Sequence, residues 1–291
     1  MTDLQLWISA LEIGSFYGLI ALCYLIVYQG ALVFNFAIGG YAMMAGIATS
    51  WLATEQGAPV WLAMLFGVVL CVGSSVLTEM VVVRPMVRRS GHDELPKLIA
   101  VTAVLFALEQ GAGAVFGRGS MPGQWLFDIE PIEMGEAVLD GAALQMFVVT
   151  GVVFALVAFW LNATRAGRML RAAGDNPVAA QVLGLPTDRI RLTAFFVAGV
   201  IAAIAGIVFA LKSGITFRSA LPWSIKGFLA AVIGGTGGAW APLVGGLLLG
   251  AIEVFVPFYL GGASVDYVIL LLAAVFFVVR PQGFFARRIR V

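Results

Sequence analysis

The side chains that could do catalytic or metal chemistry are few and scattered. His92 is the only histidine, and it stands in a charged stretch, so a histidine-based metal or proton site has nothing to build on. Cys23 and Cys71 lie inside apolar runs and are expected to be small core residues rather than a disulfide or a metal pair. We therefore expect no catalytic residue, no metal site and no cofactor in this chain.

Polar side chains inside apolar runs are the stronger functional candidates. Glu109 and Gln110 lie in the run from 98 to 116, and an ionisable residue within a membrane span is a functional hypothesis by default. The alternative is a hydrogen bond between packed helices, or a position nearer the surface. Thr236 stands among the glycines of 234–238, where backbone can turn at membrane depth or helices can approach closely.

The second apolar run, from 32 to 52, is interrupted near its start. Asn35 is followed by Gly39 and Gly40, and this pattern predicts an unwound or bent section. Non-helical backbone at membrane depth must face protein or water, so we expect Asn35, Gly39 and Gly40 to line a substrate pathway. The alternative is a connecting turn in which Asn35 caps the second helix, and both can be true.

The longest polar interruption runs from 165 to 191 and begins with three arginines. A short helix follows: Asp175 or Asn176 can cap its start, and Pro177 suits its first position. Gly184 can end the helix after about two turns, which is too short to be stable alone in water. The segment is a candidate docking element. The alternative is a surface helix on a basic loop that only sets membrane topology.

Composition indicates a membrane protein. Of the 291 residues 61% are hydrophobic and 11% are charged, and the mean hydropathy is +1.01. Soluble domains have about 25% charged residues. Apolar runs of about 18 residues or more recur, which predicts an all-α, polytopic transmembrane bundle in one domain over 1–291. We expect nine spans, or eight if one glycine-rich segment is re-entrant, with breaks near Lys212, Gly237 and Gly261.

The distribution of charge predicts the orientation. Thirteen of the 17 lysines and arginines lie in 84–97, in 165–191 and from 280 onward, whereas 117–141 is acidic. By the positive-inside rule we expect the basic segments and the C-terminus to be cytoplasmic, and the acidic loop and the N-terminus to be external. Glu79 and Arg84 can pair at the end of the third span.

Four motifs carry a resemblance to a known family, whose order and spacing the chain follows from about residue 8 to 285. They are NFAIGG at 35–40, the stretch from Arg171 through DNPVAAQVLGLP to Gly206, KGFLAAVIGGTGG at 226–238 and RPQGFF at 280–285. Together they resemble the branched-chain amino acid ABC transporter permeases, and specifically the shorter of the two permease types. The stretch Ile38-Gly39-Gly40 departs from many relatives, which are polar there, and this weakens the transfer of polar substrate contacts.

The resemblance implies a multi-pass subunit of a bacterial inner membrane, surrounded by lipid and without nucleic-acid partners. Its partners would be a second homologous permease, two ATP-binding-cassette ATPase subunits that hydrolyse the ATP, and a periplasmic substrate-binding protein. The segment 175–185 would be the helix that couples to the ATPase. The coupling residues implied are Asp175, Asn176, Pro177, Val178, Ala179, Ala180, Leu183, Gly184 and Leu185.

The implied substrate class is branched-chain or other small neutral amino acids. Relatives for urea or short amides are the alternative, because the motifs do not separate these substrates. A gradient-driven channel or secondary transporter is a further alternative, in which Glu109 and Glu253 would be proton or sodium sites.

Overall fold

The computed structural model describes the chain except residues 1–2, 91–93, 126–128, 136, 280–282 and 286–291. The α-helices are α1 (Asp3–Ala31), α2 (Ile38–Thr54), α3 (Val60–Thr78), α4 (Arg84–Ser90), α5 (Glu94–Val115), α6 (Gly141–Ala163), α7 (Arg165–Asp175), α8 (Pro177–Val182), α9 (Thr187–Ser213), α10 (Ala220–Gly234), α11 (Ala241–Leu260) and α12 (Val265–Val279). The shorter elements are the π-helical turn η1 (Glu79–Val83), the 3-10 turns η2 (Phe217–Ser219) and η3 (Gly262–Ser264), and the strands β1 (Ile132–Met134) and β2 (Ala137–Leu139).

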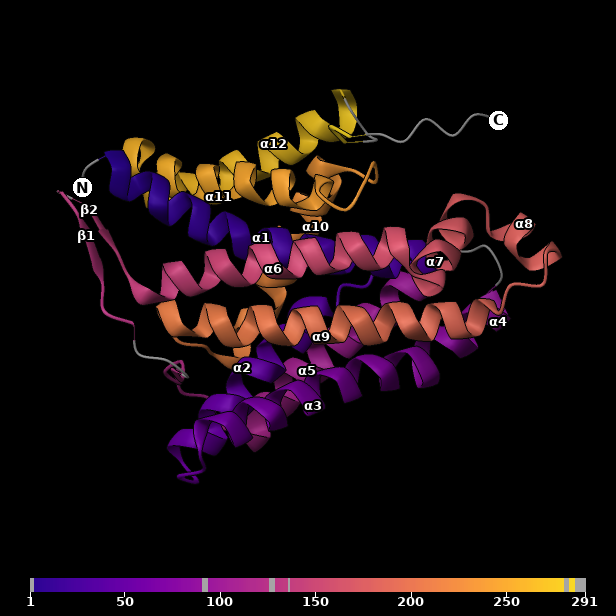
Figure 1. Cartoon of the computed structure of the whole chain (residues 1–291), viewed down its shortest axis with the longest axis horizontal. Helices are drawn as coiled ribbons and strands as arrows, with labels where there is room; N and C mark the ends of the chain where they lie inside the picture. The colour runs from indigo at the N-terminus through magenta and orange to yellow at the C-terminus, as the bar shows by residue number, and fades with distance from the viewer. Residues whose placement is uncertain (1–2, 91–93, 126–128, 136, 280–282, 286–291) are drawn as a thin grey trace.

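The long helices lie side by side along one axis (Figure 1). The antiparallel hairpin β1–β2 and the start of α1 lie at one end, which we call the hairpin end. The helices α4, α7 and α8 lie at the opposite end, which we call the arginine end. The hairpin is a small departure from the all-α prediction, and it folds within the acidic loop.

Six helical stretches in the described part of the chain are long and apolar enough to cross a membrane: α1, α3 continued through α4, α5, α6, α9 and α11. The other apolar helices, α2, α10 and α12, have 17, 15 and 15 residues, fewer than the about 20 that a full crossing takes. The multi-pass helical fold is confirmed, whereas the number of eight or nine spans stays a prediction. The expected breaks fall between α9 and α10, α10 and α11, and α11 and α12.

Helix α1 lies at the centre of the bundle, and most of its residues are buried between α9, α10 and α11. Its glycines allow this close packing. A Cβ added to Gly246 of α11 would lie 2.5 Å from the carbonyl oxygen of Gly14, and one added to Gly250 would lie 2.5 Å from that of Ala10. Gly18 faces the same helix through Leu243. Small residues therefore bring the two backbones into direct contact, as in other membrane helix pairs.

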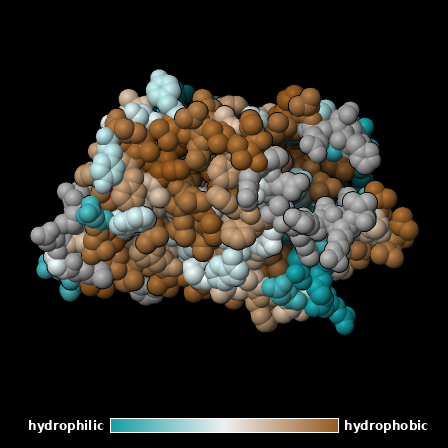
Figure 2. All heavy atoms as spheres, turned by 90° about the horizontal axis from the view of Figure 1, so that it is seen from above, coloured by the Kyte–Doolittle hydropathy of each residue, from teal (hydrophilic) through white to brown (hydrophobic). Residues whose placement is uncertain are grey.

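The outer surface is apolar. Figure 2 shows the face that carries α11 and α12, which is hydrophobic over most of its width, with hydrophilic residues gathered toward the ends. Exposed apolar residues on these two helices include Leu248, Phe258, Leu270 and Val278. Such a surface suits lipid or another membrane subunit.

Candidate functional site

The backbone between α1 and α2 is non-helical as far as Ala37, and Asn35 organises it. The Asn35 side chain is fully buried, its oxygen accepts a hydrogen bond from the Ala37 amide at 3.0 Å, and its nitrogen donates to the Tyr41 hydroxyl at 3.3 Å. The unwound stretch is thus shorter than the expected 35–40, because Gly39 and Gly40 already belong to the first turn of α2. A connecting turn, the alternative raised above, describes the geometry, but Asn35 does not cap α2, because Ala37 occupies the N-cap position and makes no side-chain cap hydrogen bond.

The two glycines of α2 serve close packing in this structure. The Gly39 amide donates to the Ser224 hydroxyl at 3.1 Å, and the same hydroxyl donates to the Phe36 carbonyl at 2.6 Å. A Cβ on Gly39 would also meet the backbone of α10, and one on Gly40 would lie 3.2 Å from Leu108 of α5. The glycines therefore seat α2 between α10 and α5.

Helix α10 lies beside the middle of α1 rather than beside either end. Trp223 packs on Phe16 with ring centroids 4.9 Å apart, and the Tyr24 hydroxyl donates to the Ser224 carbonyl at 3.0 Å. Phe16 and Tyr24 stand 13 and 21 residues beyond Asp3, which is about 20–32 Å along the helix. Helix α10, which carries the start of the motif at 226–238, therefore begins beside the middle of α1.

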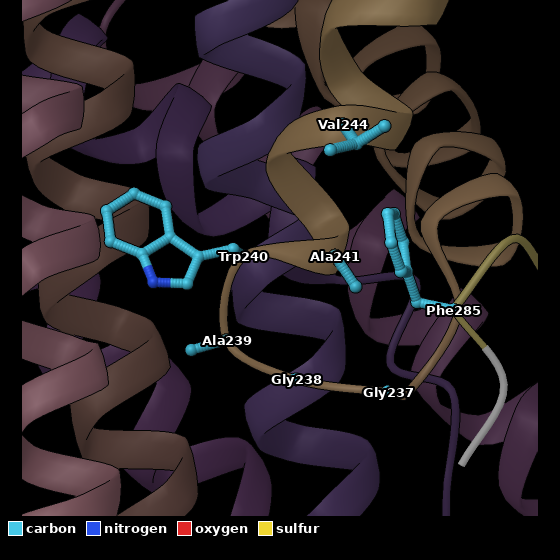
Figure 3. Close-up of a pocket in the computed structure, with 7 residues that line it drawn as sticks. All are labelled: Gly237, Gly238, Ala239, Trp240, Ala241, Val244 and Phe285. Atoms are coloured by element: carbon cyan, nitrogen blue, oxygen red, sulfur yellow. The ribbon is translucent and has the colours of Figure 1, made fainter.

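The loop between α10 and α11 borders an apolar pocket of about 250 Å³ (Figure 3). It is lined by Gly237, Gly238, Ala239, Trp240, Ala241, Val244 and Phe285. The Trp240 ring stacks on Phe154 of α6, with centroids 5.6 Å apart. Thr236 is exposed on the loop that leads to the pocket. The loop is therefore placed against α6.

The predicted pair Glu109–Gln110 is divided between two environments. Glu109 is buried on α5 and interacts electrostatically with Arg218 of η2, while Gln110 is exposed. The structure thus brings together Asn35, Gly39 and Gly40 and places α5 next to them. It does not bring Gln110 or Thr236 to the same place.

The segment expected to couple to an ATPase forms two helices, α7 and α8, at the arginine end. Of the two candidate caps, Asn176 is the one used: its side-chain oxygen accepts from the Ala179 amide at 2.9 Å, with Pro177 at the first helical position. Asp175 is the last residue of α7. Gly184 ends α8 with φ of 73°, a left-handed conformation that favours glycine.

One face of this segment is apolar and open to solvent. Val182 is 82% exposed and Leu183 is 79% exposed, and Val178 is exposed beside them, whereas Ala180 is buried. Leu185 is half-buried and its amide donates to the Ala180 carbonyl at 3.0 Å. Buried Ala180 anchors α8, and its other side presents an apolar ridge outward.

A buried charge cluster ties this segment to the third span. Glu79, in the π-helical turn η1, accepts from Arg84 at 3.0 Å and 3.2 Å and from Arg191 at 2.8 Å. Arg191 also pairs with Asp188 at 2.6 Å, and Asp188 pairs with Arg88 at 2.8 Å. The expected Glu79–Arg84 pair is confirmed. Arg191 was missed, because its partner lies 112 residues away in the sequence.

A second charge cluster lies at the hairpin end. The Lys212 ammonium contacts Glu12 of α1 at 2.8 Å and Asp140 at 3.0 Å. Asp140 caps α6 by accepting from the Ala143 amide at 2.7 Å. Burial alone raises the pKa of Asp140, but the hydrogen bonds from Ala143 and Lys212 outweigh it and hold that pKa below its usual range. The cluster joins α1, α6 and α9.

A separate ion pair lies between α10 and α11, beside Tyr17 of α1. Lys226 and Glu253 pair there, and the Lys226 ammonium lies 5.8 Å from the centre of the Tyr17 ring. Sequence reasoning named Glu253 only as an ion site of a gradient-driven transporter and missed Lys226. The available signal was a single lysine within the apolar, glycine-rich motif at 226–238.

Comparisons with known proteins agree with one another. A family model described as "Branched-chain amino acid transport system / permease component" matches residues 7–280. The branched-chain amino acid permease LivH of Salmonella typhimurium is 28% identical over 98% of this chain and 96% of LivH. BraD of Pseudomonas aeruginosa is 27% identical over 98% of this chain and 96% of BraD. Among solved structures, a chain of PsaBC from Streptococcus pneumoniae in complex with Fab shares the fold, with a TM-score of 0.51 and 11% sequence identity. The match covers 96% of this chain and 92% of that chain.

Proposed function

Because the chain belongs to the family of branched-chain amino acid transport permease components, we propose that it is the membrane permease subunit of an ATP-driven importer for branched-chain or other small neutral amino acids. The observation that carries this proposal is the match of the family model over nearly the whole chain, together with the names of full-length relatives. The chain is a transport subunit in a single permease domain over 1–291, and ATP hydrolysis belongs to its partners.

The coupling element is α8 with its flanking residues. The exposed ridge of Val178, Val182 and Leu183 supports this assignment, because an apolar surface on a basic, membrane-peripheral segment suits the groove of a soluble partner. The short helix is held rigid by its Asn176 cap and its Gly184 end. Movement of α8 reaches the third span through Arg191 and Glu79, because their ion pair joins α9 to η1.

The assembly we propose contains a second homologous permease, two ATP-binding-cassette ATPase subunits and a periplasmic substrate-binding protein. The apolar outer surface (Figure 2) is available to the second permease and to lipid. The candidate pathway runs past Asn35, Gly39, Gly40 and Glu109 in the middle of the bundle, and the two permeases alternate between outward-open and inward-open states as the ATPases close and separate. Gln110 and Thr236 stay candidates at its edge.

The orientation in the bacterial inner membrane follows from the charge distribution. The arginine end faces the cytoplasm, where the ATPases are, and the hairpin end faces the periplasm. The start of α1 lies beside the hairpin, because the Gln5 side chain accepts from the Val138 amide at 2.9 Å. The N-terminus is accordingly periplasmic and the C-terminus cytoplasmic.

Two alternatives make different predictions. Urea or a short amide is the first, as the substrate of a permease of the same family. A gradient-driven transporter is the second, and it needs an intramembrane carboxylate free to bind a proton or sodium ion. Lys226 already neutralises the charge of Glu253, so a proton or sodium ion would find no uncompensated charge there, which favours the importer.

The test is purification of the chain from mild detergent with its partners, followed by reconstitution into liposomes. We expect two ATPase copies and a second permease to co-purify, and uptake of leucine to require both ATP and the liganded binding protein. Uptake of leucine by the chain alone, driven by a proton or sodium gradient, would contradict the importer. ATP-driven uptake of urea without leucine would keep the importer and change its substrate.

A further inference from the structure

The ion pair between Lys226 and Glu253 lies where three helices meet. Lys226 projects from α10 and Glu253 from α11, and Tyr17 of α1 contacts both, with its ring 5.8 Å from the ammonium and its hydroxyl interacting with the carboxylate. Glu253 stands one turn beyond Gly250, whose backbone packs on Ala10 in the first half of α1. The pair therefore lies within the membrane-spanning length of α1.

Charged side chains at membrane depth are costly, and they are found where they face protein or a water-filled cavity. Both side chains are 20% exposed, so the pair opens to the surface of this subunit. The exposed apolar residue Ile225 directly precedes Lys226 on α10, and the Tyr17 ring lies against the ammonium. A paired acid and base bordered by apolar side chains has the composition of a site for a small amphipathic molecule.

The pair has unused hydrogen-bonding capacity. Glu253 Oε2 is buried and has no hydrogen-bond partner among the residues that the structure describes, although buried polar atoms are nearly always paired. The Lys226 ammonium has three N–H donors, and its hydrogen bond in the described structure goes to Glu253 Oε1. An incoming ammonium group could use the free carboxylate oxygen, and an incoming carboxylate could use the remaining donors.

The polar groups expected to line the pathway, in contrast, use their hydrogen-bonding capacity within the protein. Asn35 satisfies its own turn and Tyr41, and the Ser224 hydroxyl bridges Gly39 and Phe36. Their hydrogen bonds hold the backbone together, so a substrate would have to displace structure to use them. Lys226 and Glu253 hold no backbone turn in place, and a substrate would exchange their mutual hydrogen bond while Tyr17 stays beside both.

We propose that Lys226 and Glu253 bind the two charged ends of a zwitterionic amino acid as it passes through the membrane, Lys226 the carboxylate and Glu253 the ammonium. This inference rests on the proposed function. When the site is empty the two residues neutralise each other, and when it is filled each is neutralised by the substrate. The site therefore never holds an isolated charge in the membrane. Tyr17 and Ile225 provide apolar surface for the aliphatic side chain.

The first experiment separates recognition from assembly. The complete importer is reconstituted with K226Q or E253Q, and uptake of radiolabelled L-leucine and ATP hydrolysis are measured in the same liposomes. We expect uptake per ATP to fall at least about tenfold, because each variant removes a charge-assisted contact to substrate. Hydrolysis stimulated by the binding protein should persist. An unchanged ratio of uptake to hydrolysis in both variants would overturn the proposal.

K212Q is the matched control, because it also removes a paired lysine from the bundle, but at the hairpin end. We expect its uptake per ATP to stay at the wild-type value. The exchanged variant K226E/E253K then distinguishes recognition from a structural latch. It restores the ion pair with reversed polarity, so a reversed zwitterion would direct its side chain away from Tyr17 and uptake should remain low. Full recovery of leucine uptake would identify a latch and refute the binding role.

A second measurement tests the site without altering the ion pair, in case K226Q or E253Q fails to assemble. I225C keeps the native pair and places a thiol next to it, on a residue that is 43% exposed. Millimolar L-leucine should slow maleimide labelling of this thiol in the complex without binding protein, and leucinamide, which lacks the carboxylate, should protect less. Equal labelling with and without leucine would contradict the site. If the wild-type importer carries urea and no amino acid, the proposed substrate class fails, and the zwitterion site fails with it.

Discussion

The two ends of α9 carry charge clusters that differ in how deeply they are buried. At the arginine end the side chains of Glu79 and Arg191 are 0% and 6% exposed, and two arginines share one carboxylate. At the hairpin end Lys212 is 34% exposed and reaches two carboxylates, of which Asp140 is half open to solvent. At the arginine end, the loss of one partner leaves a buried charge that water does not reach. At the hairpin end, water reaches the cluster and can replace part of a lost interaction.

This difference matches the task proposed for each end. In the proposed function the arginine end would receive the movement of α8, and a buried bidentate network with fixed geometry would transmit that movement as a unit. It meets the third span at η1, a π-helical turn, and such turns occur frequently at functional sites. The hairpin end only has to hold α1, α6 and α9 side by side.

The largest effect is expected from R191A. It leaves Glu79 buried with Arg84 alone, and removing one partner of a buried pair costs about 3–5 kcal/mol. Thermal unfolding of the purified complex in detergent should show the loss. R189A is the matched control, because Arg189 is an exposed arginine of the same helix that lies outside the contacts described above. If R191A lowers the free energy of unfolding by less than about 1 kcal/mol, the value typical of surface pairs, the arginine end is no more dependent on buried charge than the hairpin end.

A smaller effect is expected from K212A at the hairpin end. Glu12 would be left buried without its cation, which costs about 1–3 kcal/mol, reduced by water that reaches the site. The same thermal unfolding experiment measures it. The double variant E12Q/K212M should recover most of the stability, because no charge remains unpaired. A loss as large as that of R191A would show that the two ends are equally buried in the assembled protein.

G184V tests whether α8 acts with the arginine end. Valine is strained at φ of 73°, at a cost of about 1–2 kcal/mol, and none of the residues that the structure describes lies close enough to Gly184 for a clash. We expect membrane insertion to persist and transport per ATP to fall, because the end of α8 changes direction. A179E should do the same by placing a charge on the docking segment. Normal coupled transport in both variants would contradict the docking assignment.

The smallest effect is expected from R88A. Arg88 and Asp188 are largely exposed, and exposed ion pairs contribute about 0–1 kcal/mol. The melting temperature should barely change, and what change there is should disappear in high salt. A loss comparable to that of R191A would mean that the whole arginine network, rather than its buried half, carries the stability.

Features set by neighbouring residues could be predicted from the sequence. The helix cap at Asn176, the end of α8 at Gly184 and the Glu79–Arg84 pair depend on residues within a few positions of one another. The breaks between the last four helices followed from hydropathy and glycine content.

Features that join distant segments could not be predicted. Gly39 was assigned to an unwound pathway, but its place against Ser224 is decided by a helix 185 residues later. The same holds for Arg191 with Glu79, and for Lys226 with Glu253, which are 27 residues apart on different helices. A single sequence gives the type of each side chain and its local backbone, while tertiary packing chooses the partner.

The central position of α1 has a consequence for how the protein is made. Ribosomes add about 5–20 residues per second, and α11, which covers the glycines of α1, is among the last helices to appear. The first helix therefore waits in the bilayer for roughly 10–50 s before its permanent neighbour is synthesised. During that time Gly14 and Gly18 face lipid or an assisting insertion factor. We expect chains that stop before Ala241 to expose this face and to be degraded, however well their earlier helices have inserted.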